Sequence, residues 1–122
     1  YAVNAFTRML FESLDKRIMK LSPRVKKEYK KLYVAYKLDT NFVDIVFQKQ
    51  RLRISINMKF SELNDPNGIC KDISGLGRWG NGDVELFMEH QDELDQIMEI
   101  VKQSYDAQAE GGIDCGLAIN IL

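Results

Sequence analysis

The chain has 122 residues, of which 45% are hydrophobic and 29% are charged. This length suits a single domain with one core, and the composition excludes the polar, aromatic-poor class of disordered chains. No apolar run approaches the roughly 18 residues of a membrane-spanning helix, and the first residues lack the pattern of a secretion signal, so we expect a cytoplasmic protein without a membrane partner.

The formal net charge of −1 hides a strong asymmetry between the two halves of the chain. Residues 1–59 carry 14 Lys and Arg against 5 Asp and Glu, a net charge of +9, whereas residues 60–122 carry 3 against 13, a net charge of −10. Such a split is typical of a basic face that meets an anionic partner, or of two halves that attract each other once packed. The second explanation needs fewer assumptions.

The first part of the chain has the apolar spacing of a helix. Between Ala5 and Leu21, apolar residues recur at intervals of three and four, which predicts a helix with one buried stripe. Ser22 and Pro23 then resemble a helix stop followed by a restart, because Ser caps free backbone N–H groups and Pro fits the first helical position. We therefore expect a short second helix through Tyr29.

The apolar period changes to two after Leu32. Residues alternate between two faces in the runs from Leu32 to Lys37 and from Arg51 to Asn57, and the run from Phe42 to Gln48 between them is also predicted to be a strand. The short links between these runs predict antiparallel hairpins. Arg51 and Arg53 fall on the face opposite the apolar residues of their run, and we expect that face to be wet.

The C-terminal half predicts a loop, a strand, a helix and a tail. Ser74 to Asp83 is rich in glycine, Val84 to Met88 has strand character, and Gln91 to Tyr105 has a second helical stripe. We therefore expect an α+β domain over residues 1–106, in which the N- and C-terminal helices pack on one face of an antiparallel sheet of about four strands. The apolar tail, residues 107–122, is predicted to add an edge strand or to contact a partner.

Several blocks resemble a known family: Tyr33 to Lys37, Asn41 to Asp44, Gln48 to Arg53, Glu62 to Gly68 and Trp79 to Glu85. The chain is similar, over roughly Leu10 to Tyr105, to an uncharacterised bacterial and archaeal domain family labelled "predicted transport protein". The resemblance implies a free-standing domain or a C-terminal module beside nuclease-like or restriction-associated domains, and it implies no activity. Similar sequences often have His at the position of Arg78, so no role for a histidine is carried over. The chain begins on Tyr1, which suggests a fragment of a longer protein.

The segment Gly75 to Gly80 matches the G-x-G-x-x-G pattern of dinucleotide-binding loops. A strand follows here, however, where such a site needs a helix whose N-terminus faces the phosphates, so we expect no cofactor. A structural loop that lets the backbone pass close beside Trp79 agrees better with the context. An intermediate hypothesis is that the loop N–H groups and Arg78 bind an anion.

Four carboxylates are candidates for metal-dependent phosphoryl transfer, as a rival to a purely binding role: Asp44, Asp72, Asp83 and Glu85. The order of Asp44, Gln48 and Lys49 is close to that of many nucleases, but Lys49 is one residue out of register and alternation places it on the opposite face. Turn and hairpin-edge positions explain these acids with fewer assumptions. No sequence neighbours indicate catalysis, metal binding or a disulfide for the single histidine, His90, or for the two cysteines, Cys70 and Cys115.

Basic residues between Arg24 and Arg53 are the stronger functional signal, with aromatic residues interleaved among them. We expect a non-catalytic accessory domain of a larger intracellular assembly, with a protein partner or a second copy of the chain, and with nucleic acid as a further candidate ligand. The candidate binding residues are Lys37, Lys49, Arg51, Arg53, Arg78 and Trp79. No metal site is assigned. The alternatives are a phosphoryl-transfer enzyme that uses Asp72, Asp83 and Glu85, and a homo-oligomerisation domain.

Overall fold

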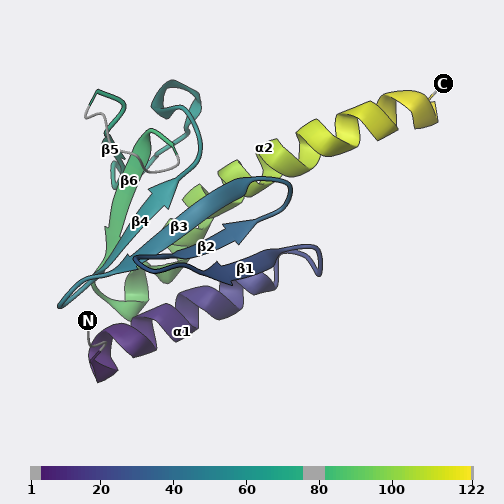
Figure 1. The fold of residues 1–122 in the computed structure, drawn as a ribbon. Coiled ribbons are helices and arrows are strands. Elements are labelled where there is room, and N and C mark those ends of the chain that lie inside the picture. Colours follow the sequence, from purple (N-terminus) through teal and green to yellow (C-terminus); the bar gives the residue numbers. More distant parts are fainter. Residues whose placement is uncertain (1–3, 76–81, 122) are drawn as a thin grey trace.

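The computed structural model describes residues 4–75 and 82–121, with side chains up to residue 109. Its elements are, in chain order, α1 (Ala5–Met19), β1 (Lys26–Tyr29), β2 (Val34–Lys37), β3 (Asn41–Phe47), β4 (Leu52–Ile56), the 3₁₀ turn η1 (Phe60–Glu62), β5 (Lys71–Asp72), β6 (Val84–Met88), the 3₁₀ turn η2 (Gln91–Glu93) and α2 (Leu94–Ile121). Figure 1 shows their arrangement.

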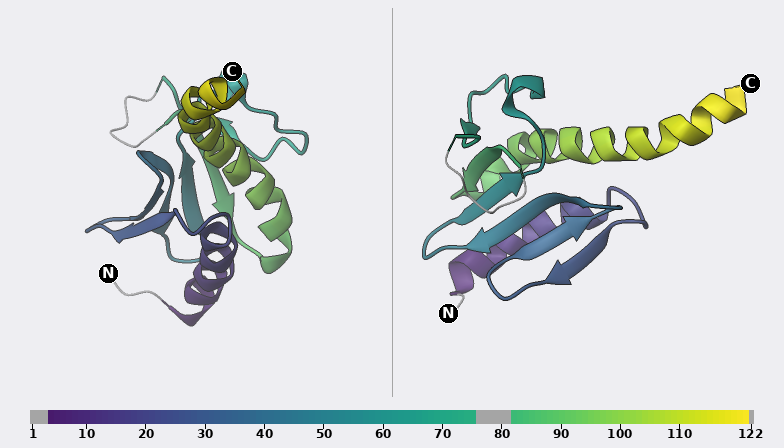
Figure 2. Two further views of the ribbon diagram at one scale, coloured as in Figure 1. Left: turned by 90° about the vertical axis from the view of Figure 1, so that its right-hand side faces the viewer. Right: turned by 45° about the horizontal axis from the view of Figure 1, so that its top comes forward.

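The strands form one antiparallel sheet in the order β1-β2-β3-β4-β6-β5. Helix α1 contacts β4, whereas α2 contacts β3 and β4, and the two helices lie side by side on the same face of the sheet (Figure 2). The predicted α+β class, antiparallel sheet and terminal helices are therefore confirmed. The predicted number of about four strands is wrong, because β1 and β5 make six.

Alternation of apolar residues builds the centre of the sheet. Leu52, Ile54 and Ile56 of β4 are fully buried, while Arg53 and Ser55 between them are only partly buried. The apolar residues of β3 and β6 lie opposite them in register, so the same face of three neighbouring strands meets the helices. Burying an Ile or Leu side chain contributes roughly 1.5–3 kcal/mol, which makes this layer the main stabilising contact.

The short helix expected through Tyr29 is a strand instead. Lys26–Tyr29 pairs with Val34–Lys37 through a tight turn, in which the Lys30 N–H donates to the Tyr33 carbonyl at 2.8 Å. A single helical turn leaves most of its backbone groups unpaired, whereas pairing with β2 satisfies half of those in β1. Val25, just before β1, is buried, whereas Tyr29 is 69% exposed.

The tail is helical where the structure describes it, not an edge strand. After η2, helix α2 runs to Ile121 and extends past the sheet (Figure 1). Continuing a helix that is already formed costs less than starting a new strand pairing, because each added residue gains one backbone hydrogen bond. Contact of the tail with a partner stays a prediction, since the side chains beyond residue 109 are not described.

A β-bulge in β3 connects the sheet to α2. Tyr36 lies opposite Val43 and Lys37 lies opposite Asn41, so Phe42 has no partner on β2. The Phe42 ring is fully buried and meets the edge of the Tyr105 ring, with 5.5 Å between the ring centroids. The buried Ser104 hydroxyl donates to the Phe42 carbonyl at 3.0 Å, which fixes α2 against the bulge.

Replacing Ile54 with Ala should lower the free energy of unfolding by about 2–5 kcal/mol, because it leaves a cavity at the centre of the apolar layer. Leu32→Ala is the matched control, because Leu32 is 63% exposed and its truncation should cost less than about 0.5 kcal/mol. Urea unfolding of the two variants measures both values. Equal losses would contradict the assignment of the core.

Candidate functional site: the face of the sheet opposite the helices

The face of the sheet that points away from both helices is called the open face here. No described helix covers it (Figure 2). The register of β2, β3, β4 and β6 determines which side chains belong to it, since residues that lie opposite each other share a face. These residues are Ala35, Lys37, Asp44, Val46, Arg53, Ser55, Glu85 and Phe87.

Two acidic side chains of the open face are buried although no helix of the described residues covers them. Asp44 is 5% exposed and Glu85 is 2% exposed, and both lie opposite Ser55, one on each side of β4. The Asn41 amide donates to Asp44 Oδ1 at 3.0 Å. Burying ionisable groups costs free energy unless partners compensate for it, so such groups are more frequent at binding sites than in ordinary sheets.

Two guanidinium groups lie toward one end of the open face. The Arg51 guanidinium carbon is 3.7 Å from the centroid of the Phe87 ring, and its Nε–H donates to Gln48 Oε1 at 2.7 Å. Arg53 follows two residues later on the same face, opposite Phe87 in the register. Stacking on Phe87 and the bond to Gln48 hold Arg51 in one orientation, so less conformational entropy is lost when it binds an anion.

Arg53 lies close to the buried Glu85. Its Nε lies 3.9 Å from Glu85 Oε1, too far for a hydrogen bond, and this buried Nε has no hydrogen-bond partner within the described residues. The Arg53 side chain is 32% exposed, so the acidic half of the chain approaches this arginine without covering it. The charge of Glu85 nevertheless reduces the positive potential that Arg53 presents.

The candidate binding residues from the sequence do not form one patch. Lys49 is exposed in the turn between β3 and β4, next to Arg51, and its carbonyl accepts a hydrogen bond from the Asn4 side chain at 2.6 Å. Lys37 lies toward the other end of the face, because Arg53 pairs with Val46 and Lys37 pairs with Asn41. Five residues along a strand correspond to roughly 16 Å.

Lys37 is also held by a local ion pair, 2.8 Å from its ammonium group to Glu28 Oε1. This contact lowers the pKa of Glu28 and offsets part of the charge of Lys37. The remaining two candidates, Arg78 and Trp79, lie outside the described residues. Arg51 and Arg53 are therefore the candidates that share one end of the open face, whereas Lys49 lies in the adjacent turn and lines a hollow with Asn4, Phe6 and Glu89.

The carboxylates proposed for phosphoryl transfer are not gathered. Asp72 lies opposite Val84, whereas Lys71 lies opposite Glu85, so Asp72 and Glu85 point to different faces of the sheet. Asp72 Oδ1 accepts hydrogen bonds from the Ser74 hydroxyl and N–H, which lower the pKa of Asp72. Over residues 4–75 and 82–121, no three His, Cys, Asp or Glu side chains come close enough together to hold a metal ion.

Sequence reasoning missed Phe87 and Gln48, the two side chains that position Arg51. Phe87 could have been found, because the alternation in β6 that buries Val84, Leu86 and Met88 places Phe87 on the other face. Gln48 had no such signal, since it follows the end of β3 and its role depends on the turn geometry.

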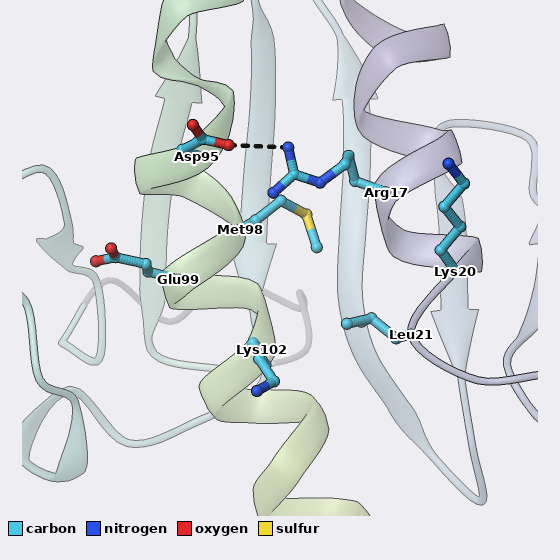
Figure 3. A pocket seen from close by; sticks show the side chains of 7 residues that line it. All are labelled: Arg17, Lys20, Leu21, Asp95, Met98, Glu99 and Lys102. Atoms are coloured by element: carbon cyan, nitrogen blue, oxygen red, sulfur yellow. Dashed lines mark hydrogen bonds and ion pairs between the residues drawn. The ribbon is translucent and has the colours of Figure 1, made fainter.

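A groove lies between the two helices, on the side of the sheet opposite the open face (Figure 3). This groove has a volume of about 450 Å³ and is lined by Arg17, Lys20, Leu21, Asp95, Met98, Glu99 and Lys102. Arg17 and Asp95 form an ion pair of 2.9 Å across it. The remaining charges are of both signs, so the groove does not select a ligand by charge.

Within residues 4–75 and 82–121, no helix has the length and apolar character needed to cross a membrane.

Burial, with the nearby Asp65 carboxylate, raises the pKa of the Cys70 thiol to about 12. In a Cys115→Ser variant, Cys70 is the remaining thiol. At pH 8 it should react with a disulfide reagent roughly 50- to 100-fold more slowly than a peptide thiol, because the attacking thiolate is over a thousandfold rarer and its greater nucleophilicity restores only part of the rate. Absorbance of the released reagent thiolate measures the rate, and unfolding in urea should restore it. A fast reaction of the folded protein would show that Cys70 is an available nucleophile.

Comparison with known proteins gives a family but no activity. An uncharacterised protein of Haemophilus influenzae is 39% identical over 99 residues, which cover 81% of this chain and 33% of that protein. The chain thus spans about a third of the length of the curated relative it matches. No solved structure matches it. The model of the family described as "Domain of unknown function (DUF5655)" matches residues 1–108, and the chain therefore belongs to this family.

Proposed function

We propose that the chain is a non-catalytic binding module of a larger intracellular assembly, and that it contacts nucleic acid through Lys49, Arg51 and Arg53. The observation that carries this proposal is the placement of two guanidinium groups on the face of the sheet that no described helix covers. A sheet face is wide enough to follow a phosphate backbone, as it does in other folds that bind single strands.

The length of the relative from Haemophilus influenzae supports the role of a module. The Haemophilus influenzae relative is about three times as long as the matched region, so further parts of that protein accompany this domain there. The resemblance to modules found beside nuclease-like domains agrees with a nucleic-acid ligand, although it is an association and not a mechanism.

Phosphate recognition by this face rests mainly on Arg51. Its guanidinium presents several N–H groups in one plane, suited to two phosphate oxygens at once, and the Phe87 ring keeps that plane in place. Arg53 adds a second charge beside it, reduced by Glu85. Lys49, exposed in the adjacent turn, extends the basic surface along the edge of the face.

The double variant Arg51→Gln/Arg53→Gln tests the proposal. Glutamine removes both charges without placing a new carboxylate beside Glu85, which glutamate would do. We expect at least tenfold weaker binding of a fluorescein-labelled single-stranded oligonucleotide, measured by anisotropy. The slope of log K against log salt should fall in magnitude by about 1.4, because each neutralised phosphate on a single strand contributes roughly 0.7.

The matched control is Lys59→Gln/Lys102→Gln, which removes the same charge from exposed positions off the open face. It should change the affinity by less than about threefold. The proposal fails if the arginine variant is folded and binds as tightly as the unmodified chain. It also fails if the control weakens binding by the same factor, because net charge alone would then explain the effect.

A further inference from the structure

The outer edge of β1 is a second surface with the features of a binding site. β1 is the first strand of the sheet, paired with β2 alone, and no described segment lies along its outer side (Figure 2). Hydrogen-bonded and non-hydrogen-bonded pairs alternate in an antiparallel ladder. Because Lys30 bonds to Tyr33, the N–H and C=O groups of Glu28 face β2, and those of Lys27 and Tyr29 face outward.

Hydrogen bonds from β1 and β2 to a carboxylate of α1 hold this edge in place. Asp15 Oδ1 accepts hydrogen bonds from the Lys27 ammonium group at 3.0 Å and from the Tyr36 hydroxyl at 2.7 Å. One carboxylate oxygen on the helix therefore fixes β1 and its neighbour β2 together. A strand that is ordered before binding loses little conformational entropy when another strand pairs with it.

The side chains around the edge combine positive charge with exposed apolar surface. Arg24, Lys26 and Lys31 are exposed, and no ion pair involves them within the described residues. Tyr29 is 69% exposed and Leu32 is 63% exposed, more than any other large hydrophobic side chain in the described part of the chain. Lysine on an edge strand commonly prevents aggregation, but that role does not explain two exposed apolar side chains beside it.

We propose that the β1 edge binds an extended acidic segment of a partner protein, which adds a strand to the sheet. The outward groups alternate between donor and acceptor, a pattern that a peptide backbone complements and that phosphate, an acceptor, does not. Carboxylates in the segment would meet Lys26 and Lys31, and apolar residues between them would cover Tyr29 and Leu32. A second copy of this chain would instead bring one basic β1 against another.

The inference is independent of the open-face proposal, because β1 and β4 are separated in the sheet by two strands. It is tested on the whole chain with a labelled peptide of about twelve residues that alternates Glu and Val. A Lys/Val peptide of the same length is the charge control, and a single-stranded oligonucleotide is the control for a general preference for anions. We expect measurable binding of the Glu/Val peptide and none of the Lys/Val peptide.

Tyr29→Pro is the decisive variant. Proline removes the outward N–H of residue 29 and no hydrogen bond to β2, and proline is tolerated on edge strands. It should weaken peptide binding at least tenfold, whereas the matched Tyr29→Ala keeps the N–H and should weaken it less. The double variant Lys26→Glu/Lys31→Glu should also abolish peptide binding. Binding of the oligonucleotide should not change in Tyr29→Pro.

Hydrogen exchange on the unmodified chain gives a readout that does not depend on a variant folding. The Lys27 and Tyr29 amides should exchange quickly in the isolated chain and at least tenfold more slowly with saturating peptide, while the amide of Glu28 is already protected. The proposal is overturned if these two amides keep their rates, if Tyr29→Pro binds the peptide normally, or if the peptide does not bind. Protection of the same two amides by the oligonucleotide would also overturn it. A mass twice the 14.1 kDa of one chain in light scattering, lost in Tyr29→Pro, would show that a second copy of the chain occupies the edge instead.

Discussion

The structure depends on the burial of one face of β4 against both helices. Leu52, Ile54 and Ile56 are fully excluded from solvent, and successive side chains of a strand point to opposite faces, so Arg51, Arg53 and Ser55 have to lie on the other side. A shift of the register by one residue would bury two guanidinium groups in an apolar layer, at a cost of several kcal/mol for each ion. The same constraint that builds the core therefore determines the composition of the open face.

The opposite charges of the two halves are only partly explained by attraction between them. Arg17 of α1 pairs with Asp95 of α2, and Arg53 of β4 approaches Glu85 of the neighbouring strand β6. Both are contacts between the two halves. Other basic residues find their partners within the N-terminal half: Lys27 pairs with Asp15, and Lys37 pairs with Glu28. Several cations around β1 and in the turn after β3 have no ion pair among the described residues, and these positions are the two surfaces to which we assign binding.

The elements with a clear apolar period could be predicted from the sequence, and the others could not. Helix α1 and strands β4 and β6 have such a period, β3 is a mostly apolar run of strand length, and all four were predicted within two residues at most of their ends. β1 has none, because the sequence Lys-Lys-Glu-Tyr has no alternation of apolar side chains and becomes a strand only by pairing with β2. β5 has two residues, too few for any periodicity. The apolar tail was predicted to add an edge strand or to contact a partner, yet α2 continues through it to Ile121.

For the site, alternation correctly placed Arg51 and Arg53 on the face opposite the apolar layer, but it could not separate Lys37 from them. That separation arises from the antiparallel register and from the bulge at Phe42, neither of which can be read from spacing alone. The burial of Asp44 and Glu85 was equally hidden, because an open face is expected to be wet. Residues whose environment departs from such a simple rule are often functional.

The central claim, that the helices close one face of the sheet and that no described helix covers the other, can be tested directly on adjacent residues. Ile45 and Val46 follow each other on β3, with Ile45 fully buried against the helices and Val46 partly exposed on the open face. A soluble paramagnetic chelate should broaden the NMR signals of the Val46 methyl groups and leave those of Ile45 sharp. Equal broadening of the two, or broadening of Ile45 alone, would contradict the architecture on which both proposed surfaces depend.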